Sequence, residues 1–254
     1  MWFVYCGWYV SPGRVSTLRG RVDLRYDARM CDETISRRGV FLASVAANDE
    51  ICPEHFRLRL RLKSFPPSEA GQFVQLQCRP PVEQQSAIVV DWLEEHPPRF
   101  TQPELTDQEP LLRRPLSLAN RRDDADGVEL DIMYRTTGTG TRWLAGVKTR
   151  QALSVLGPLG HGLPIIDAKP RVILIGGGVG IPPMIYLAHA LQLANKKTLA
   201  ICGARTKTHL LLMAGSDFAQ SDGSPNFCAA EFEEANTPAV IATDDGSLGV
   251  SGFV

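Results

Sequence analysis

The sequence predicts two folded regions, an antiparallel β-barrel followed by an α/β region with a parallel sheet. Short strands of alternating polarity fill the first part of the chain, and "FRLRLRLKSF" at 56–65 is the sharpest of them. After about residue 165 the pattern changes to buried strand, helix and buried strand, beginning with "RVILIGGG" at 171–178. That order is typical of parallel strands joined by crossover helices. We therefore expect one domain over 38–165 and a second over 166–254.

The bulk composition is that of an ordinary globular protein and excludes several classes of partner. The chain has 254 residues, of which 44% are hydrophobic and 22% charged, and its net charge is −1. This balance gives no electrostatic case for nucleic acid or an anionic membrane as a partner. None of the six cysteines belongs to a C-x-x-C pair, so we expect free thiols, no metal site and a cytoplasmic protein.

The N-terminal segment "MWFVYCGWYV" is apolar but too short to span a bilayer, and no later stretch is long and apolar enough to do so. Many arginines without a clear period follow it. We interpret residues 1–37 as a poorly ordered extension, or as the product of a start codon placed too early. The alternative is a small apolar element docked on the body of the protein.

Five segments of the first region have the pattern of barrel strands separated by polar turns. The arginine face of the second segment is interpreted as a solvated sheet surface. Residues 79–110 interrupt the series with prolines, Gln and Glu, and we take them as a surface insertion. The five segments are "GVFLASVAA" (39–47), "FRLRLRLKSF" (56–65), "GQFVQLQC" (71–78), "RPLSLAN" (114–120) and "VELDIMYR" (128–135).

Three glycine-bearing segments have the composition of phosphate-binding loops. In "MYRTTGTGTRWLAG" (133–146), a strand runs into Gly138, Gly140 and Thr141 and then into a helix start. Glycines let backbone N–H groups approach a ligand, and a helix N-terminus adds unpaired donors. Thr141 either adds a hydroxyl to such a site or caps the helix. A strand–turn–helix without any ligand has the same appearance.

The second segment, "IGGGVGIPPM" (175–184), lies between a buried strand and a helical pattern. Its Gly178-x-Gly180-x-x-Pro183 spacing differs from the G-x-G-x-x-G fingerprint only in the last place, and proline is acceptable in a first helical turn. Four glycines in five residues exceed the needs of a tight turn, which favours a phosphate or pyrophosphate contact.

The third segment, "LGPLGHGLP" (156–164), is interpreted as a domain-linking loop, and its His161 as a loop residue.

The sequence contains no hydrolytic constellation. It lacks a G-x-S-x-G elbow, an H-E-x-x-H pair and a Walker lysine, and its histidines are scattered. We therefore assign no catalytic side chain and expect chemistry carried by a cofactor that the protein positions.

The ordered set of motifs resembles the ferredoxin–NADP reductase-like flavoproteins, and within them the electron-transfer subunits of class 1B dihydroorotate dehydrogenases. The likeness covers roughly residues 39–254, and the motifs together are far more specific than any one of them. It implies a flavin-binding barrel followed by a Rossmann-like nucleotide-binding domain, incomplete at the C-terminus. The segments that carry the likeness are "LLRRPLSLA", "MYRTTGTGTRWL", "LGPLGHGLP", "ILIGGGVGIPPM", "CGARTK" and "ATDDGSLGVSGFV".

The resemblance implies FAD as the cofactor and NAD as the co-substrate. Arg114 would pair with the FAD diphosphate, and Ser117 would lie beside the flavin ring; Arg113 has no assigned role. Arg205 and Lys207 in "CGARTK" either touch the adenosine end of the nucleotide or face solvent. The FAD residues are Arg114, Pro115, Leu116, Ser117, Met133, Tyr134, Arg135, Gly140 and Thr141, and the nicotinamide-dinucleotide residues are Gly177, Gly178, Gly180 and Pro183.

The resemblance also implies a partner and a second redox centre. Electrons would come from dihydroorotate oxidised at FMN in a separate catalytic subunit, within a heterotetramer, and pass through a [2Fe–2S] cluster to FAD and then to NAD. The family's four cluster cysteines follow the point at which this chain stops, Val254, and none of its own cysteines matches them. We expect a fragment, or a protein without the cluster.

Two other functions remain open from the sequence. One is another reductase subunit of the same flavoprotein group, such as a sulfhydrogenase or NADH-dependent ferredoxin reductase component. The other is a flavin-free remnant that keeps the fold without catalysis.

Overall fold

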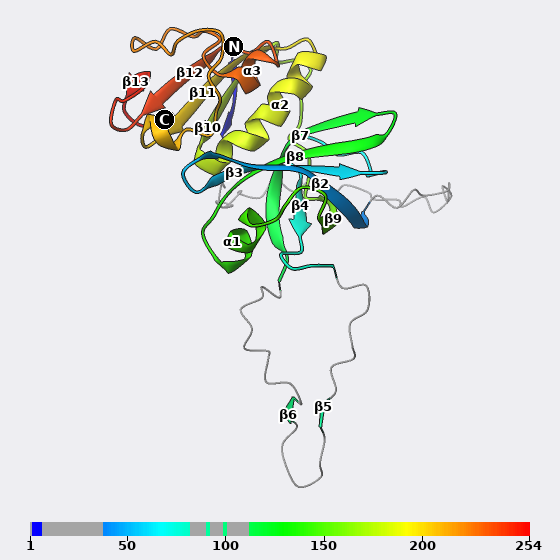
Figure 1. The fold of residues 1–254 in the computed structure, drawn as a ribbon. Helices are drawn as coiled ribbons and strands as arrows, with labels where there is room; N and C mark the ends of the chain where they lie inside the picture. Colours follow the sequence, from blue (N-terminus) through cyan, green and yellow to red (C-terminus); the bar gives the residue numbers. More distant parts are fainter. Residues whose placement is uncertain (1, 7–37, 82–89, 92–98, 101–111) are drawn as a thin grey trace, which may run out of the picture.

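The computed structural model describes residues 2–6, 38–81, 90–91, 99–100 and 112–254. In this part of the chain, six strands close into a barrel and five others form a second, parallel sheet (Figure 1). The expected fold class, a barrel followed by a Rossmann-like sheet, is confirmed. No helix among these residues is both long and apolar enough to cross a bilayer.

The barrel is antiparallel and has the strand order β2-β3-β8-β7-β4-β9. Alternating side chains fill its interior: Leu58 and Leu60 of β3 are completely buried, while Arg59 between them points outwards. The expected strands are confirmed with small shifts at their ends. Their bounds are β2 Gly39–Cys52, β3 His55–Leu62, β4 Phe73–Leu76, β7 Arg114–Asp124, β8 Gly127–Arg135 and β9 Ala152–Leu159.

The insertion leaves and re-enters the barrel at neighbouring positions. β4 and β7 are antiparallel partners, and Leu76 at the end of β4 lies opposite Arg114 at the start of β7. Within the insertion, β5 (Val90–Asp91) pairs with β6 (Arg99–Phe100). The remaining insertion residues from 82 onwards lie outside the described residues.

The second sheet has the order β1-β10-β11-β12-β13, with all neighbours parallel. The unexpected member is β1, because the sequence analysis preferred a poorly ordered N-terminus over a docked element. Residues 2–6 pair with β10, whereas residues 1 and 7–37 lie outside the described residues. Its apolar, aromatic sequence suits the edge of a parallel sheet. The bounds are β1 Trp2–Cys6, β10 Arg171–Gly177, β11 Lys197–Ala204, β12 Ala239–Thr243 and β13 Val250–Ser251.

Helix α2 (Ile181–Leu193) follows β10 through a 3-10 turn, η2 (Gly178–Gly180), and lies between the parallel sheet and the barrel (Figure 1). It packs against β10 and β11 on one side and β7 on the other. The Tyr186 hydroxyl donates a hydrogen bond of 2.7 Å to the backbone oxygen of Ser68, which ties the helix to the barrel. The two sheets are therefore held together by one shared helix. Shorter elements are α1 (Thr139–Ala145), η3 (Lys207–His209) and α3 (Ala230–Glu233).

The arginine face of β3 differs from its expected role as a solvated surface. Arg57 donates from Nε to both oxygens of Asp131 at 3.1 and 2.9 Å, and its Nη1 lies 3.4 Å from Glu231 of α3. Both carboxylates are almost fully buried. The solvated interpretation was wrong for Arg57 because alternation shows which side chains leave the barrel, but not whether another element covers them. Arg59 is more exposed, and its ion pair with Asp49 has a longer separation of 3.6 Å.

Candidate functional site

The first candidate site forms where β7 begins and α1 begins. A β-carbon built on Gly140, in the first turn of α1, would lie 2.8 Å from Nε and 3.2 Å from Cζ of Arg114. The guanidinium therefore rests directly against the backbone at the helix N-terminus, and only glycine leaves room for it. Arg114 Nη1 also donates to the Leu112 oxygen at 2.9 Å. Arginine and the first N–H groups of a helix both favour an anion.

Thr141 holds the loop in front of α1 in place. Its hydroxyl oxygen accepts hydrogen bonds from the backbone N–H groups of Thr137 at 2.9 Å and Gly138 at 3.1 Å. Of the two roles expected for this side chain, the structure shows the structural one. A β-carbon on Gly138 would meet no atom within 4 Å, so the loop surface beside it is open.

Asn48 of β2 fixes the other end of α1, and the sequence analysis missed it. Its Nδ2 donates to the backbone oxygens of Leu144 at 2.9 Å and Val147 at 3.1 Å, and its Oδ1 accepts from the Tyr134 hydroxyl at 3.2 Å. One amide thus satisfies carbonyls at the helix C-terminus and the phenol of β8. No local signal reveals this role, because Asn48 and Leu144 are 96 residues apart.

Replacing Asn48 by alanine is expected to lower the free energy of unfolding by about 1–3 kcal/mol, since buried partners lose their hydrogen bonds. Urea unfolding followed by circular dichroism measures the change. Gln192→Ala provides the control, since Gln192 is an exposed amide side chain within α2. Equal stabilities for Asn48→Ala and the parent protein would show that α1 does not depend on this amide.

Two barrel motifs, residues 114–117 and residues 133–135, carry the other expected FAD residues, and these differ in how far they are buried. Ser117 and Leu116 lie opposite Phe73 and Val74 in the β4–β7 ladder, with Pro115 between Leu116 and Arg114. Of the second motif, Met133 and Tyr134 are 3% and 1% exposed. Burial raises the pKa of the Tyr134 hydroxyl well above its usual value.

The Tyr134 ring stacks on Phe56 at 5.6 Å between centroids. The ring is 1% exposed and belongs to the barrel core. The neighbouring Arg135 is half-exposed and forms a 2.7 Å ion pair with Glu54. What this segment offers at the surface is its backbone and the Arg135 side chain.

The second candidate site is the glycine-rich turn between β10 and α2. A β-carbon on Gly176 would lie 2.9 Å from the Gly180 oxygen, so this glycine is needed by the turn itself. Gly178 has a φ of +50°, which glycine adopts without strain. A β-carbon on Gly178 would meet nothing within 4 Å, and on Gly177 only the Gly203 oxygen at 3.6 Å. Pro183 lies in the first turn of α2, as expected.

The turn lies at the carboxyl edge of the parallel sheet, where open α/β sheets bind ligands. Gly177 is opposite Gly203, and Ala204 is opposite Thr243, so the segments that follow these strands meet at one edge. Arg205 and Lys207 are exposed there, as is Asp245. The 3-10 turn η2 also contacts β8 of the barrel. The glycine turn therefore lies close to the strand that carries the second barrel motif.

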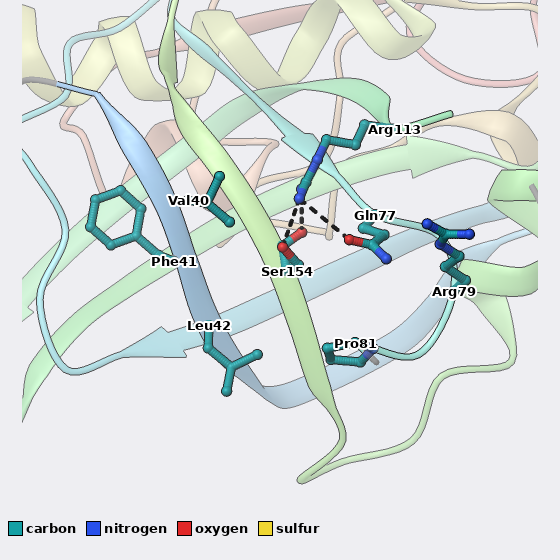
Figure 2. A pocket seen from close by; sticks show the side chains of 8 residues that line it. All are labelled: Val40, Phe41, Leu42, Gln77, Arg79, Pro81, Arg113 and Ser154. Atoms are coloured by element: carbon teal, nitrogen blue, oxygen red, sulfur yellow. Dashed lines mark hydrogen bonds between the residues drawn. The ribbon is translucent and has the colours of Figure 1, made fainter. Parts of the chain in front are cut away.

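Arg113 has a structural role that the sequence left unassigned. Its Nη1 donates to the Ser154 oxygen at 3.0 Å, and its Nη2 donates to Ser154 Oγ at 2.8 Å and Gln77 Oε1 at 3.3 Å (Figure 2). Nη1 also donates to the Gln75 oxygen at 3.3 Å. These bonds join β4 to β9 across an irregular part of their ladder. The two neighbouring arginines thus have different contacts. Arg114 lies against the start of α1, whereas Arg113 links β4 to β9.

Among the described residues, no three His, Cys, Asp or Glu side chains converge on a point that would hold a metal ion. The side chains of Cys52, Cys78, Cys202 and Cys228 are described, and all four are free. Burial raises the pKa of each of these thiols. The described residues therefore do not fit an iron–sulfur cluster.

Comparison with solved structures identifies the fold. An Amycolatopsis cytochrome P450 reductase matches 85% of this chain and 56% of its own, with a TM-score of 0.57 and 23% identity. An NADH-dependent reduced ferredoxin-NADP oxidoreductase matches 83% of this chain and 59% of its own, with a TM-score of 0.56 and 23% identity. This is the ferredoxin reductase-like fold. The FAD/NAD-binding domain of a Vibrio cholerae nitric oxide dioxygenase has the same fold at a TM-score of 0.54 and 15% identity, covering 84% of this chain and 79% of that one.

Sequence comparison confirms the narrower resemblance. The chain is 36% identical over 147 residues to the dihydroorotate dehydrogenase B (NAD+) electron transfer subunit of Bacillus mycoides. The matched residues make up 57% of this chain and 49% of the Bacillus subunit. The chain is 37% identical over 161 residues to the Geobacillus subunit of the same name, 62% of this chain and 55% of that one. The chain thus spans about half the length of the curated relatives it matches. No protein-family model matches it.

Proposed function

We propose that this chain binds FAD and NAD and transfers electrons between them, as the electron transfer subunit of a dihydroorotate dehydrogenase. The observation that carries the proposal is the contact between Arg114 and Gly140, which places a guanidinium against the N-terminus of α1. Such a pair suits a diphosphate, because the guanidinium binds two oxygens while backbone N–H groups bind a third.

Each of the residues expected from the sequence has a part in this proposal. Arg114 and the backbone of Gly140 and Thr141 hold the FAD diphosphate, and the strand continues through Pro115 and Leu116 to Ser117 beside the flavin. Met133, Tyr134 and Arg135 line the same site through their backbone. Bound FAD would supply the two-electron redox centre, which no side chain here provides. The glycine-rich turn between β10 and α2 holds NAD through Gly177, Gly178, Gly180 and Pro183.

The protein's own contribution is positioning. The glycine turn contacts β8, so a nucleotide bound at the carboxyl edge of the parallel sheet lies next to the barrel motifs. Helix α2 and the Arg57 ion pairs fix the barrel and the sheet relative to each other, and fixed geometry is what hydride transfer requires. The partner in this proposal is an FMN-containing catalytic subunit in a cytoplasmic heterotetramer. The described residues do not fit a [2Fe–2S] cluster, and we derive no step through one.

The direct test is a titration of the purified protein with FAD, followed by quenching of flavin fluorescence. A 1:1 endpoint is expected, and NADH added without oxygen should then bleach the flavin absorbance. Co-expression with a dihydroorotate-oxidising subunit should give a complex that copurifies. Reduction by NADH without formation of that complex would favour a reductase component for another acceptor. Absence of FAD binding would contradict the flavoprotein proposal and favour a flavin-free remnant.

A sharper test uses Gly140→Ala. The added methyl group would meet the Arg114 side chain, which is flexible and moves aside, so the stability should change little while FAD affinity falls about five- to tenfold. Gly146→Ala is the matched control, since Gly146 lies at the other end of α1 with a φ of −81° and its added carbon would be 3.4 Å from the Trp143 oxygen, an ordinary contact. Equal FAD affinity in both variants would show that the guanidinium does not need its place against α1.

A further inference from the structure

A cavity of about 430 Å³ lies on the outer face of the barrel, apart from the Arg114 site. It is formed by the strands β2 and β9 and by the segment that follows β4 (Figure 2). A volume of this size accommodates a small organic molecule. The side chains that define its character are Arg79, Arg113, Gln77, Ser154, Val40 and Leu42.

Two guanidinium groups give the cavity a positive charge that no carboxylate of the described residues neutralises. Burial, and secondarily the nearby charge of Arg79, lower the pKa of Arg113. The acceptors of Arg113 in the described part of the chain are neutral: the backbone oxygens of Gln75 and Ser154, the Ser154 hydroxyl and the Gln77 amide oxygen. Within the described residues, no carboxylate pairs with either arginine. Two like charges in a half-buried place are costly unless an anion joins them.

Arg79 adds a donor without an acceptor. Its Nε is buried and makes no hydrogen bond to any described residue. Buried donors are nearly always paired, and at the edge of the cavity this N–H is available to an acceptor that enters it. Guanidinium N–H groups fit carboxylate and phosphate oxygens in bidentate fashion.

The opposite wall is apolar and open. Val40 and Leu42 project from β2 with 63% and 65% of their surface exposed, and Pro81 lies beside Arg79 on the rim (Figure 2). Two large aliphatic side chains at alternate positions of one strand form an unusual exposed face. The cavity thus combines a cationic end with an apolar end.

We propose that this cavity binds a small amphipathic anion, with its carboxylate or phosphate group between Arg79 and Arg113 and its apolar part against Val40 and Leu42. The site is separate from the proposed FAD site, because Arg113 turns to β4 and β9 whereas Arg114 turns to α1. The proposal therefore does not depend on whether the protein binds FAD.

The test is isothermal titration calorimetry of the full chain with octanoate and with octyl phosphate, below their micellar concentrations, in the presence and absence of FAD. Saturable 1:1 binding is expected for at least one probe, and the better probe distinguishes a carboxylate from a phosphate ester. Octanol and inorganic phosphate, which each lack one half of the ligand, should bind more weakly. Higher salt should weaken the binding, because screening acts on the ionic part.

The decisive variant is Arg79→Gln, because the buried Arg79 Nε has no acceptor among the described residues and is the donor that the proposed anion would use. This variant should bind the better probe with an affinity at least about tenfold lower, and Leu42→Gln should lower the affinity as well. Arg59→Gln is the matched control, because the Arg59 Nε also lacks a hydrogen bond but the side chain is paired with Asp49. Absence of saturable binding, equal affinity in Arg79→Gln and Arg59→Gln, or displacement of the probe by FAD would each overturn the proposal.

Discussion

Replacing Arg57 by methionine is expected to lower the free energy of unfolding by about 3–5 kcal/mol. The change removes the only cation, among the described residues, that pairs with both Asp131 and Glu231, and it leaves two buried carboxylates without compensation. Glu231 is 3% exposed, and this burial raises the pKa of its carboxyl group. Urea or thermal unfolding at neutral pH measures the loss.

Two controls separate the buried pair from a general effect of losing an arginine. Arg59→Met removes a neighbouring, more exposed arginine of the same strand and should cost at most about 1 kcal/mol. Adding Asp131→Asn and Glu231→Gln to Arg57→Met should recover part of the stability, because neutral amides no longer need a cation. If Arg57→Met and Arg59→Met are equally stable, the ion pairs do not hold the two sheets together.

Replacing Arg114 by alanine is expected to weaken FAD binding by about 1.5–3 kcal/mol, roughly ten- to a hundredfold in Kd. A charge-assisted bond to the diphosphate is lost, while the helix N-terminus and the rest of the site remain. Flavin fluorescence titration gives the affinity. Arg114→Lys keeps the positive charge but loses the bidentate geometry. Its FAD affinity should therefore lie between those of the parent protein and Arg114→Ala.

Arg122→Ala is the matched control for this experiment. Arg122 is an exposed arginine of the same strand, and its side chain faces Glu129 and Glu234. FAD affinity should not change in this variant. An Arg114→Ala protein with unchanged affinity would remove the guanidinium from the proposed diphosphate site and leave the helix N-terminus to account for binding alone.

Local patterns were sufficient for most of the architecture. The alternation in β3 predicted a strand with one buried face, and the glycines before α2 predicted a turn from strand to helix, because both signals arise within a few residues. Arg114 and Gly140 were each singled out as site residues, yet the sequence said nothing about their contact. Their proximity depends on the path of the barrel between them.

The features that escaped prediction are all contacts between distant segments. Arg57 meets Glu231, which is 174 residues away, and Asn48 caps a helix 96 residues away. Arg113 was left without a role because Gln75, Gln77 and Ser154, which accept its hydrogen bonds, are 36 to 41 residues away in the sequence. β1 escaped because its partner strand begins far along the chain, at Arg171.

The meeting of β4 and β7 has a practical consequence for protein engineering. Leu76 and Arg114 are ladder partners, so the two ends of everything between them are already neighbours in space. The entropy of closing a loop grows only slowly with its length, so exchanging residues 82–111 for a longer or shorter segment should change stability little. Cys78 and Arg113 have to be kept, because Cys78 is buried and Arg113 joins β4 to β9. With these residues and Arg114 unchanged, the insertion is a suitable place for a reporter module or an affinity tag.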